Sequence, residues 1–261
     1  MRRFPRWAWV PFALACLFLA LPLTGMLTRV DWIGLPGLLT SDRAIDALRL
    51  SLLTCTASTL LVLLVGVPTA LVLARSTGWW VDAVRTLVTV PMVLPPVVAG
   101  LALLVTLGRR GLIGAPLSVL GIQIGFTTLA VVLAQTFVAL PYLVVSLDGA
   151  LRTTGAEYEE AAAHLGAGPG RTFWRVTLPM VAPALASGTA LSFARALGEF
   201  GASITFAGSL QGVTRALPLE IYLLRETDSD LALALAVVLV GAAIAIVAVS
   251  TLMRGRDGRT P

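Results

Sequence analysis

The sequence predicts an all-α protein, a polytopic bundle of about six membrane-spanning helices, and three observations support this. Hydrophobic residues make up 57% of the 261 residues and charged residues only 13%, whereas soluble domains usually carry about a quarter charged residues. The apolar residues occur in runs of about 20, the length that crosses the hydrocarbon core of a bilayer. All 19 basic residues are arginine. They cluster between the apolar runs, which is typical of a membrane-oriented chain and not of one that binds nucleic acid.

Run length defines the spans, and each is expected to form a helix in contact with membrane lipid. In chain order they cover about residues 7–27, 46–74, 87–107, 125–147, 178–197 and 231–253. Prolines fall inside the third, fourth and fifth spans. We expect kinked helices there, because neighbouring helices can satisfy the carbonyls that a proline frees. The first span resembles a signal peptide, but it lacks a clear small-x-small cleavage site and is expected to be retained.

The arginines also predict the orientation of the bundle. With both termini in the cytoplasm, the cytoplasmic side carries eleven arginines, at positions 2, 3, 6, 75, 85, 152, 171, 175, 254, 256 and 259. The external side then carries six, at positions 29, 43, 109, 110, 215 and 225. This asymmetry follows the positive-inside bias, although the pair at 109 and 110 runs against it. The predicted organisation is an N-terminal region (1–45) with the first helix and an external loop, a transmembrane core (46–253) and a cytoplasmic tail (254–261).

The residue inventory disfavours catalysis. Without lysine the chain cannot form a GxxxxGK[ST] phosphate-binding loop. His164 is the only histidine, so neither an HExxH site nor a serine–histidine triad can be built. Cys16 and Cys55 lie in apolar segments without zinc spacing. No TVGYG-type filter appears. A membrane-embedded enzyme and a channel are therefore the disfavoured alternatives, and we expect no cofactor or metal in this chain.

The loop between the fourth and fifth spans predicts a short cytoplasmic helix over about 157–165. Thr154 and Glu157 have the spacing of a capping box, and acidic residues in the first turn suit the positive end of the helix dipole. Gly166 can adopt the left-handed conformation that closes a helix. We expect the Gly-Pro-Gly sequence at 168–170 to prevent the helix from resuming.

One face of this helix is apolar, because Tyr158, Ala161, Ala162 and Leu165 follow the spacing i, i+3, i+4 and i+7. A helix this short is marginal unless this face packs on something. It can pack on the protein's own helix ends, or it can dock in a groove of a separate cytoplasmic subunit. Spacing alone leaves both possibilities open.

The same region resembles a known family motif. Glu160-Ala161-Ala162, three residues, Gly166, nine residues and then Val176-Thr177-Leu178-Pro179 resembles the EAA motif of bacterial ABC importer permeases, with valine in place of the usual isoleucine. The resemblance extends over about residues 49–253. It implies that 157–165 is a coupling helix on a separate ATPase subunit, which would bind ATP and Mg²⁺. The implied docking residues are Glu157, Tyr158, Glu160, Ala161, Ala162, Leu165 and Gly166.

A second segment indicates the substrate. ARALGEFGASITFAG (194–208), followed by ALPLEIY (216–222), resembles the molybdate branch of these permeases. Sulfate permeases share the arginine, the glutamate and EFG but diverge afterwards, so sulfate or thiosulfate is the alternative, and tungstate is not distinguished from molybdate. The resemblance implies an extracytoplasmic molybdate-binding protein and pairing with a second copy of the chain, although related importers also pair two different permeases.

The residues of this second segment allow two roles. Arg195 and Glu199 can pair at i, i+4 on one helical face, and charges in membrane helices often mark a pathway. Together with Ser203 and Thr205 they are candidates for a pathway or gate. The ion pair can equally brace the helix, and the two hydroxyls can equally satisfy backbone carbonyls.

Overall fold

A computed structural model describes residues 6–154 and 156–257. Within these ranges every regular element is helical and no strand occurs. Arg2, Arg3, Gly155 and Arg259, together with the last four residues of the predicted tail, 258–261, lie outside the described residues. The described part of the chain therefore confirms the predicted all-α class.

Five helical segments are long and apolar enough to cross a membrane: α1 (Trp9–Leu27), α3 (Asp42–Arg75), α7 (Thr128–Thr154), the continuous stretch Pro169–Leu197, and α13 (Ser229–Asp257) over Ser229–Thr251. Counting the bent pair α4 and α5 as one more gives up to six, in agreement with the predicted number. A short helix η1 (Arg6–Ala8) precedes α1.

The third predicted span differs from a kinked helix. It consists of two helices, α4 (Trp79–Val93) and α5 (Pro96–Leu107), which meet at an angle of 117°. Leu94 and Pro95 between them have extended backbones, with ψ of 133° at both residues. Each of these residues precedes a proline, which disfavours the helical conformation. Two consecutive prolines therefore break the span where a single one would only bend it.

Shorter helices join the long ones, and run length did not predict most of them because none is long enough to cross a bilayer. They are α2 (Leu35–Leu39), α6 (Gly114–Val119), α8 (Glu157–His164), α9 (Pro169–Thr172), the π-helical turn η2 (Phe173–Thr177), α11 (Gly201–Ala207) and α12 (Leu217–Leu224). Of these, α9 and η2 run directly into α10 (Leu178–Leu197) and complete the fifth span.

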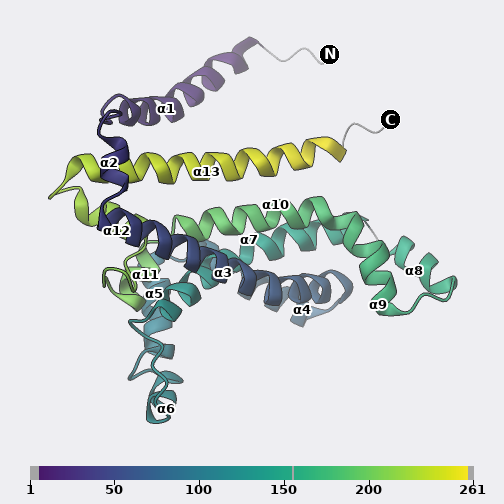
Figure 1. Cartoon of the computed structure of the whole chain (residues 1–261). Helices are drawn as coiled ribbons and strands as arrows, with labels where there is room; N and C mark the ends of the chain where they lie inside the picture. The colour runs from purple at the N-terminus through teal and green to yellow at the C-terminus, as the bar shows by residue number, and fades with distance from the viewer. Residues whose placement is uncertain (1–5, 155, 258–261) are drawn as a thin grey trace.

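The centre of the bundle is α7, which packs against α3 on one side and α10 on another, while α13 packs on α10 (Figure 1). Near α8 the core consists of the buried residues Ala70, Leu73, Val81, Val144, Leu147, Leu151 and Val181. Farther from α8, α5 and α11 approach so closely that a Cβ at Gly100 would lie 2.7 Å from the carbonyl oxygen of Ala202. In contrast, α1 stands apart from the bundle and none of its residues is buried (Figure 1).

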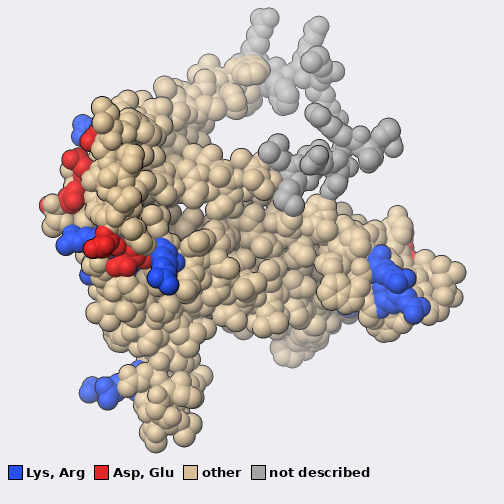
Figure 2. All heavy atoms as spheres, in the orientation of Figure 1, with Lys and Arg blue, Asp and Glu red and all other residues tan. Residues whose placement is uncertain are grey.

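The two ends of the bundle differ in their elements. The end that carries α8 and α9, called here the α8 end, also contains the last turns of α3 and α7 and the first turn of α4, whereas α2, α6 and α12 lie at the opposite end (Figure 1). The last turn of α13 points toward the same side as α8 in this view. On the face shown in Figure 2 the charged side chains gather at the two ends and the long helices between them are uncharged. This distribution is the one expected of a chain that spans a bilayer.

Candidate coupling site

The predicted cytoplasmic helix is present as α8, Glu157–His164, but the predicted capping box is wrong. The N-cap is Ala156, which makes no side-chain cap. Thr154 is instead the last residue of α7, and its hydroxyl donates to the carbonyl oxygen of Ala150 at 2.9 Å. A threonine within a helix commonly bonds the carbonyl four residues earlier, and this bond competes with capping.

The end of α8 follows the prediction for Gly166. Its φ is +82°, in the left-handed region. The Gly166 N–H donates to Ala163 O at 2.9 Å, and the Ala167 N–H donates to Ala162 O at 3.0 Å. These two bonds form a Schellman motif. The chain nevertheless returns to helix at Pro169, because proline suits the first position of a helix, so the expected block by Gly-Pro-Gly is wrong.

The predicted apolar face of α8 points away from the bundle. Tyr158 is 58% exposed and Leu165 is 89% exposed. Ala161 is also exposed, Ala162 is half-buried, and no residue of α8 is buried. Within the described chain this face therefore does not pack on the protein's own helix ends, which was one of the two possibilities left by the sequence.

Glu159 holds the side of α8 that faces the bundle. Arg75 donates to its carboxylate through both Nε (3.0 Å to Oε2) and Nη2 (2.6 Å to Oε1). The Thr177 hydroxyl donates to the same Oε1 at 2.7 Å, and Arg75 Nη1 donates to Leu151 O at 3.2 Å. We call Arg75, Glu159 and Thr177 the α8 clamp. It joins α3, α7, α8 and η2 at one point.

The clamp perturbs the acidity of Glu159. Partial burial of the carboxyl raises its pKa, but hydrogen bonds from Arg75 and Thr177 and the positive charge of Arg75 outweigh this effect and hold the pKa below its usual range. Glu159 is therefore a carboxylate at neutral pH, which allows the two-point contact with the guanidinium. Behind the clamp, between α3, α8, α9 and η2, lies an open cavity of about 370 Å³ with all three clamp residues in its wall.

Sequence reasoning did not select the clamp residues as a site. Glu159 was noted only as part of an acidic first turn, and Thr177 only as a position within the family motif. Arg75 is 84 positions from Glu159, so no local pattern connects the two. Helical spacing gave no signal either, because Glu159 lies about 100° from Tyr158 and about 120° from Leu165 around the helix axis, beside the apolar face and not opposite to it.

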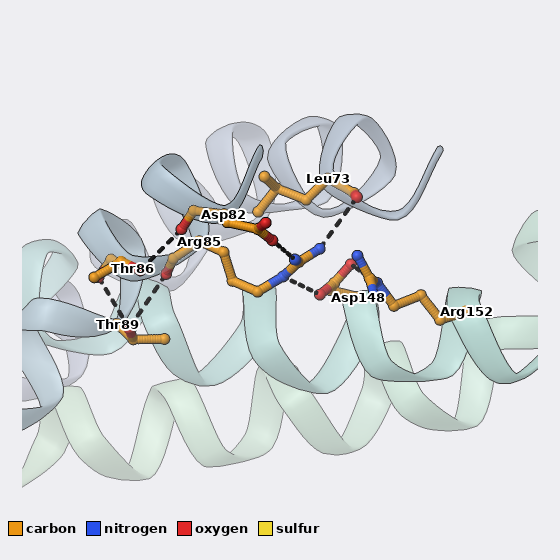
Figure 3. A network of polar contacts seen from close by, with 7 residues as sticks. All are labelled: Leu73, Asp82, Arg85, Thr86, Thr89, Asp148 and Arg152. Atoms are coloured by element: carbon orange, nitrogen blue, oxygen red, sulfur yellow. Dashed lines mark hydrogen bonds and ion pairs between the residues drawn. The ribbon is translucent and has the colours of Figure 1, made fainter. Parts of the chain in front are cut away.

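A second network, drawn in Figure 3, ties the neighbouring helix ends together. Arg85 of α4 pairs with Asp148 of α7 at 3.1 Å and donates to Leu73 O of α3 at 3.3 Å. Arg152 pairs with the other oxygen of Asp148 at 3.2 Å. Asp82 also pairs with Arg85, at 3.2 Å, but within α4 itself. The network therefore connects α3, α4 and α7 at the α8 end.

The predicted pair of Arg195 and Glu199 is confirmed, with Nη1 and Oε2 2.7 Å apart. The Glu199 side chain is 1% exposed and that of Arg195 25%. Oε1 of Glu199 also accepts the Ala202 N–H at 2.7 Å, at the start of α11. The pair thus joins the end of α10 to the following helix.

The two candidate hydroxyls of α11 differ. Thr205 donates to Gly201 O at 2.9 Å, so it satisfies a backbone carbonyl. Ser203 is buried, and its hydroxyl has no hydrogen-bond partner within the described chain. An unsatisfied buried hydroxyl carries a desolvation cost, which distinguishes Ser203 from its neighbour.

Comparison with known families identifies the chain. The family described as "Binding-protein-dependent transport system inner membrane component" matches residues 66–255, most of the molecule. The chain belongs to this family. Being such an inner membrane component, it is a multi-pass protein of the bacterial inner membrane, and the resemblance to ABC importer permeases is confirmed.

Individual relatives of this inner membrane component are named as transport proteins. It is 56% identical over 258 residues to "Molybdenum transport system permease protein ModB" of Mycobacterium tuberculosis, covering 98% of this chain and 95% of the relative. It is 33% identical over 248 residues to "Sulfate transport system permease protein CysT" of Escherichia coli, covering 94% and 90%. These names indicate a permease rather than a catalytic subunit.

A solved structure shares the fold. A chain of the bacterial alginate ABC transporter, in complex with an alginate pentasaccharide-bound periplasmic protein, superposes with a TM-score of 0.73 at 18% identity. The match covers 97% of this inner membrane component and 95% of the other chain. The broken third span and the short helix α8 therefore occur within a fold that ABC transporter permeases adopt.

Proposed function

We propose that this chain is the permease subunit of an ATP-driven importer of molybdate, with tungstate equally acceptable as a dianion of similar size. The observation that carries this proposal is the 56% identity to a ModB protein over nearly the whole chain. The lower identity of 33% to a sulfate permease makes sulfate or thiosulfate the second candidate. The permease itself holds no cofactor, and ATP and Mg²⁺ are bound by a separate ATPase subunit.

In this proposal α8 is the coupling helix. Its outward face, with Tyr158, Ala161 and Leu165 exposed, docks in a groove of the ATPase as an amphipathic helix does. The remaining docking residues are Glu157, Glu160, Ala162 and Gly166. Closure of two ATPase subunits around ATP moves the two coupling helices. The helix bundles then rock between states that open to opposite sides of the membrane.

The orientation follows from the same arrangement. If α8 meets a cytoplasmic ATPase, the end of α13 lies on the cytoplasmic side as well (Figure 1), which agrees with the arginine asymmetry and supports cytoplasmic termini. The opposite end then faces an extracytoplasmic molybdate-binding protein. A second copy of the chain completes the translocation path, and residues 46–253 form the transmembrane core that encloses it.

We assign the region around α11 to the path or gate. Arg195 keeps a quarter of its side chain exposed beside a buried carboxylate, and the buried Ser203 hydroxyl lacks a partner within the described chain. A passing oxyanion accepts hydrogen bonds from both kinds of group. Glu199 holds Arg195 in place, and Thr205 shares the same helix.

The test uses the complete complex of permease, ATPase and binding protein in proteoliposomes. ATP hydrolysis is measured with binding protein loaded with molybdate, sulfate or phosphate, and uptake is measured with and without ATP. Stimulation by molybdate and uptake that requires ATP are expected. Stimulation by sulfate alone would overturn the substrate, and uptake without ATP would favour a channel.

Docking of α8 is tested separately by crosslinking. Photoreactive groups placed at Tyr158, Ala161 and Leu165 of the working transporter are expected to capture the ATPase. Capture of this chain's own residues alone would contradict the coupling role.

A further inference from the structure

We propose that the α8 clamp is the mechanical link through which α8 moves the membrane helices, with Arg75 and Glu159 as positioning residues. This inference rests on the proposed docking of α8 on an ATPase. It concerns the side of α8 that faces the bundle, through which a displacement of α8 reaches α3 and α7.

Packing alone holds α8 weakly. No residue of the helix is buried, its most extensive contacts are with α9 and η2, and an open cavity of about 370 Å³ lies between residues of α3, α8, α9 and η2. An eight-residue helix is marginal by itself. A force applied to such a helix is lost as local movement unless a directional contact connects it to the bundle.

The clamp supplies that contact. The guanidinium of Arg75 meets both oxygens of Glu159 through two hydrogen bonds, and such a two-point contact constrains angle as well as distance. The side chains are only 28% and 25% exposed, so solvent screens the pair less than a surface pair. Because Arg75 also bonds Leu151 O and Glu159 also accepts from Thr177, the carboxylate cannot shift without displacing four elements.

The second network extends this rigid region. Arg85 and Asp148 tie α4 to α7 and, through Leu73 O, to α3 (Figure 3). These are the same two long helices, α3 and α7, that Arg75 connects. Movement of Glu159 therefore acts on α3, α4 and α7 together at the α8 end. Asp82 is not part of this link, because its side chain is 81% exposed and, among the described residues, its ion pair is with Arg85 of its own helix.

The first experiment compares Glu159→Gln with the matched control Asp82→Asn in the reconstituted importer. Both substitutions neutralise a carboxylate beside an arginine at the same end of the molecule. Glu159→Gln is expected to lower the molybdate taken up per ATP hydrolysed by about five-fold or more, the lower end of typical coupling factors. ATPase co-purification and the hydrolysis rate are expected to stay near the native values, and Asp82→Asn should match the native chain.

The ratio of uptake to ATP hydrolysis distinguishes a role of Glu159 in coupling from a role in stability alone. Loss of folded protein lowers uptake and hydrolysis in proportion and leaves the ratio unchanged. The double exchange Arg75→Glu with Glu159→Arg should recover part of the ratio that each single exchange loses. Thr177→Val removes one hydrogen bond to Glu159 and leaves the ion pair with Arg75, so it should lower uptake per ATP by less. This variant replaces Glu159→Gln in the test if Glu159→Gln fails to assemble. A native ratio in both Glu159→Gln and Thr177→Val would overturn the inference.

A distance measurement gives an independent check. Spin labels are placed through His164→Cys on α8 and Thr77→Cys just after α3, in a Cys16→Ser background. The distance between them is expected to be the same with and without ATP when the clamp is native, and to vary in Glu159→Gln. A distance that changes with ATP in the native clamp would refute the rigid link. If crosslinks from α8 never reach the ATPase, the proposed function fails instead.

Discussion

Gly166 offers the sharpest test of the end of α8. Its φ of +82° is left-handed, and a Cβ added there would meet nothing within 4 Å. Within this chain, replacement by alanine therefore causes no clash, and its effect on α8 comes from backbone strain, at a cost of about 1–2 kcal/mol. A change of that size shifts a local equilibrium by roughly 5- to 30-fold. Because α8 has no buried residue to offset it, we expect the strain to unravel the Schellman turn.

The chain provides its own control two residues later. Gly168 has an ordinary φ of −71°, and a Cβ there also meets nothing within 4 Å. Alanine at either position lowers the conformational entropy of the unfolded chain to the same degree. Gly168 is the N-cap of α9, where alanine is less favourable than glycine, so the difference between Gly166→Ala and Gly168→Ala gives a lower bound on the cost of the left-handed backbone. Asparagine at 166 should give an intermediate result, because it tolerates this conformation better than alanine.

The assay measures molybdate uptake, co-purification of the ATPase and the amount of permease in the membrane for each variant. Uptake and co-purification are expected to fall in the order glycine, asparagine, alanine and valine at 166, with equal membrane insertion. Gly168→Ala should lower both readings less than Gly166→Ala does. If Gly166→Ala and Gly168→Ala gave the same uptake, the reasoning from backbone strain would be wrong.

Three further predictions concern packing, charge and pH. Gly100→Ala should lower the thermal midpoint of the purified permease through an overpacking cost of about 1–3 kcal/mol, whereas Gly241→Ala, with nothing within 4 Å, should not. Arg195→Met should cost about 3 kcal/mol by leaving the buried Glu199 carboxylate unpaired, and adding Glu199→Gln should recover part of the lost midpoint. The pKa of Glu159 is lowered in the folded protein, so the stability that its carboxylate contributes is complete above the usual glutamate pKa and is lost only as the pH falls below it. Uptake per ATP should therefore stay level from pH 8 to about 5. A decline within that window would contradict an intact clamp.

The features predicted from sequence depend on local chemistry. Run length identified the long spans, because a bilayer imposes a fixed apolar length on each helix. The end of α8 was predictable because a left-handed residue at that position favours glycine strongly, and Gly166 adopts that conformation. The Arg195–Glu199 pair was predictable because positions i and i+4 are neighbours on any helix.

The features that were missed depend on competition or on distance along the chain. The Thr154 hydroxyl had two possible partners, and only the extent of α7 determines that it bonds Ala150 O. The clamp joins residues 84 and 18 positions apart, so it exists only once α3, α7 and η2 are packed. The break at Pro95 has a local cause, but its angle of 117° was not predictable, because α5 packs on α11, a helix distant along the chain.

In α8 the charged contact points inward and the apolar residues point outward, the reverse of an ordinary surface helix. Under the proposed docking, the residues that bind the ATPase, such as Tyr158 and Leu165, are distinct from Glu159, which attaches the helix to its own bundle. The two sets can therefore be changed independently. Substitutions at the outward-facing residues of this one short helix would then suit the permease to a different ATPase. The path for the oxyanion and the contact of Glu159 with the bundle would stay unchanged.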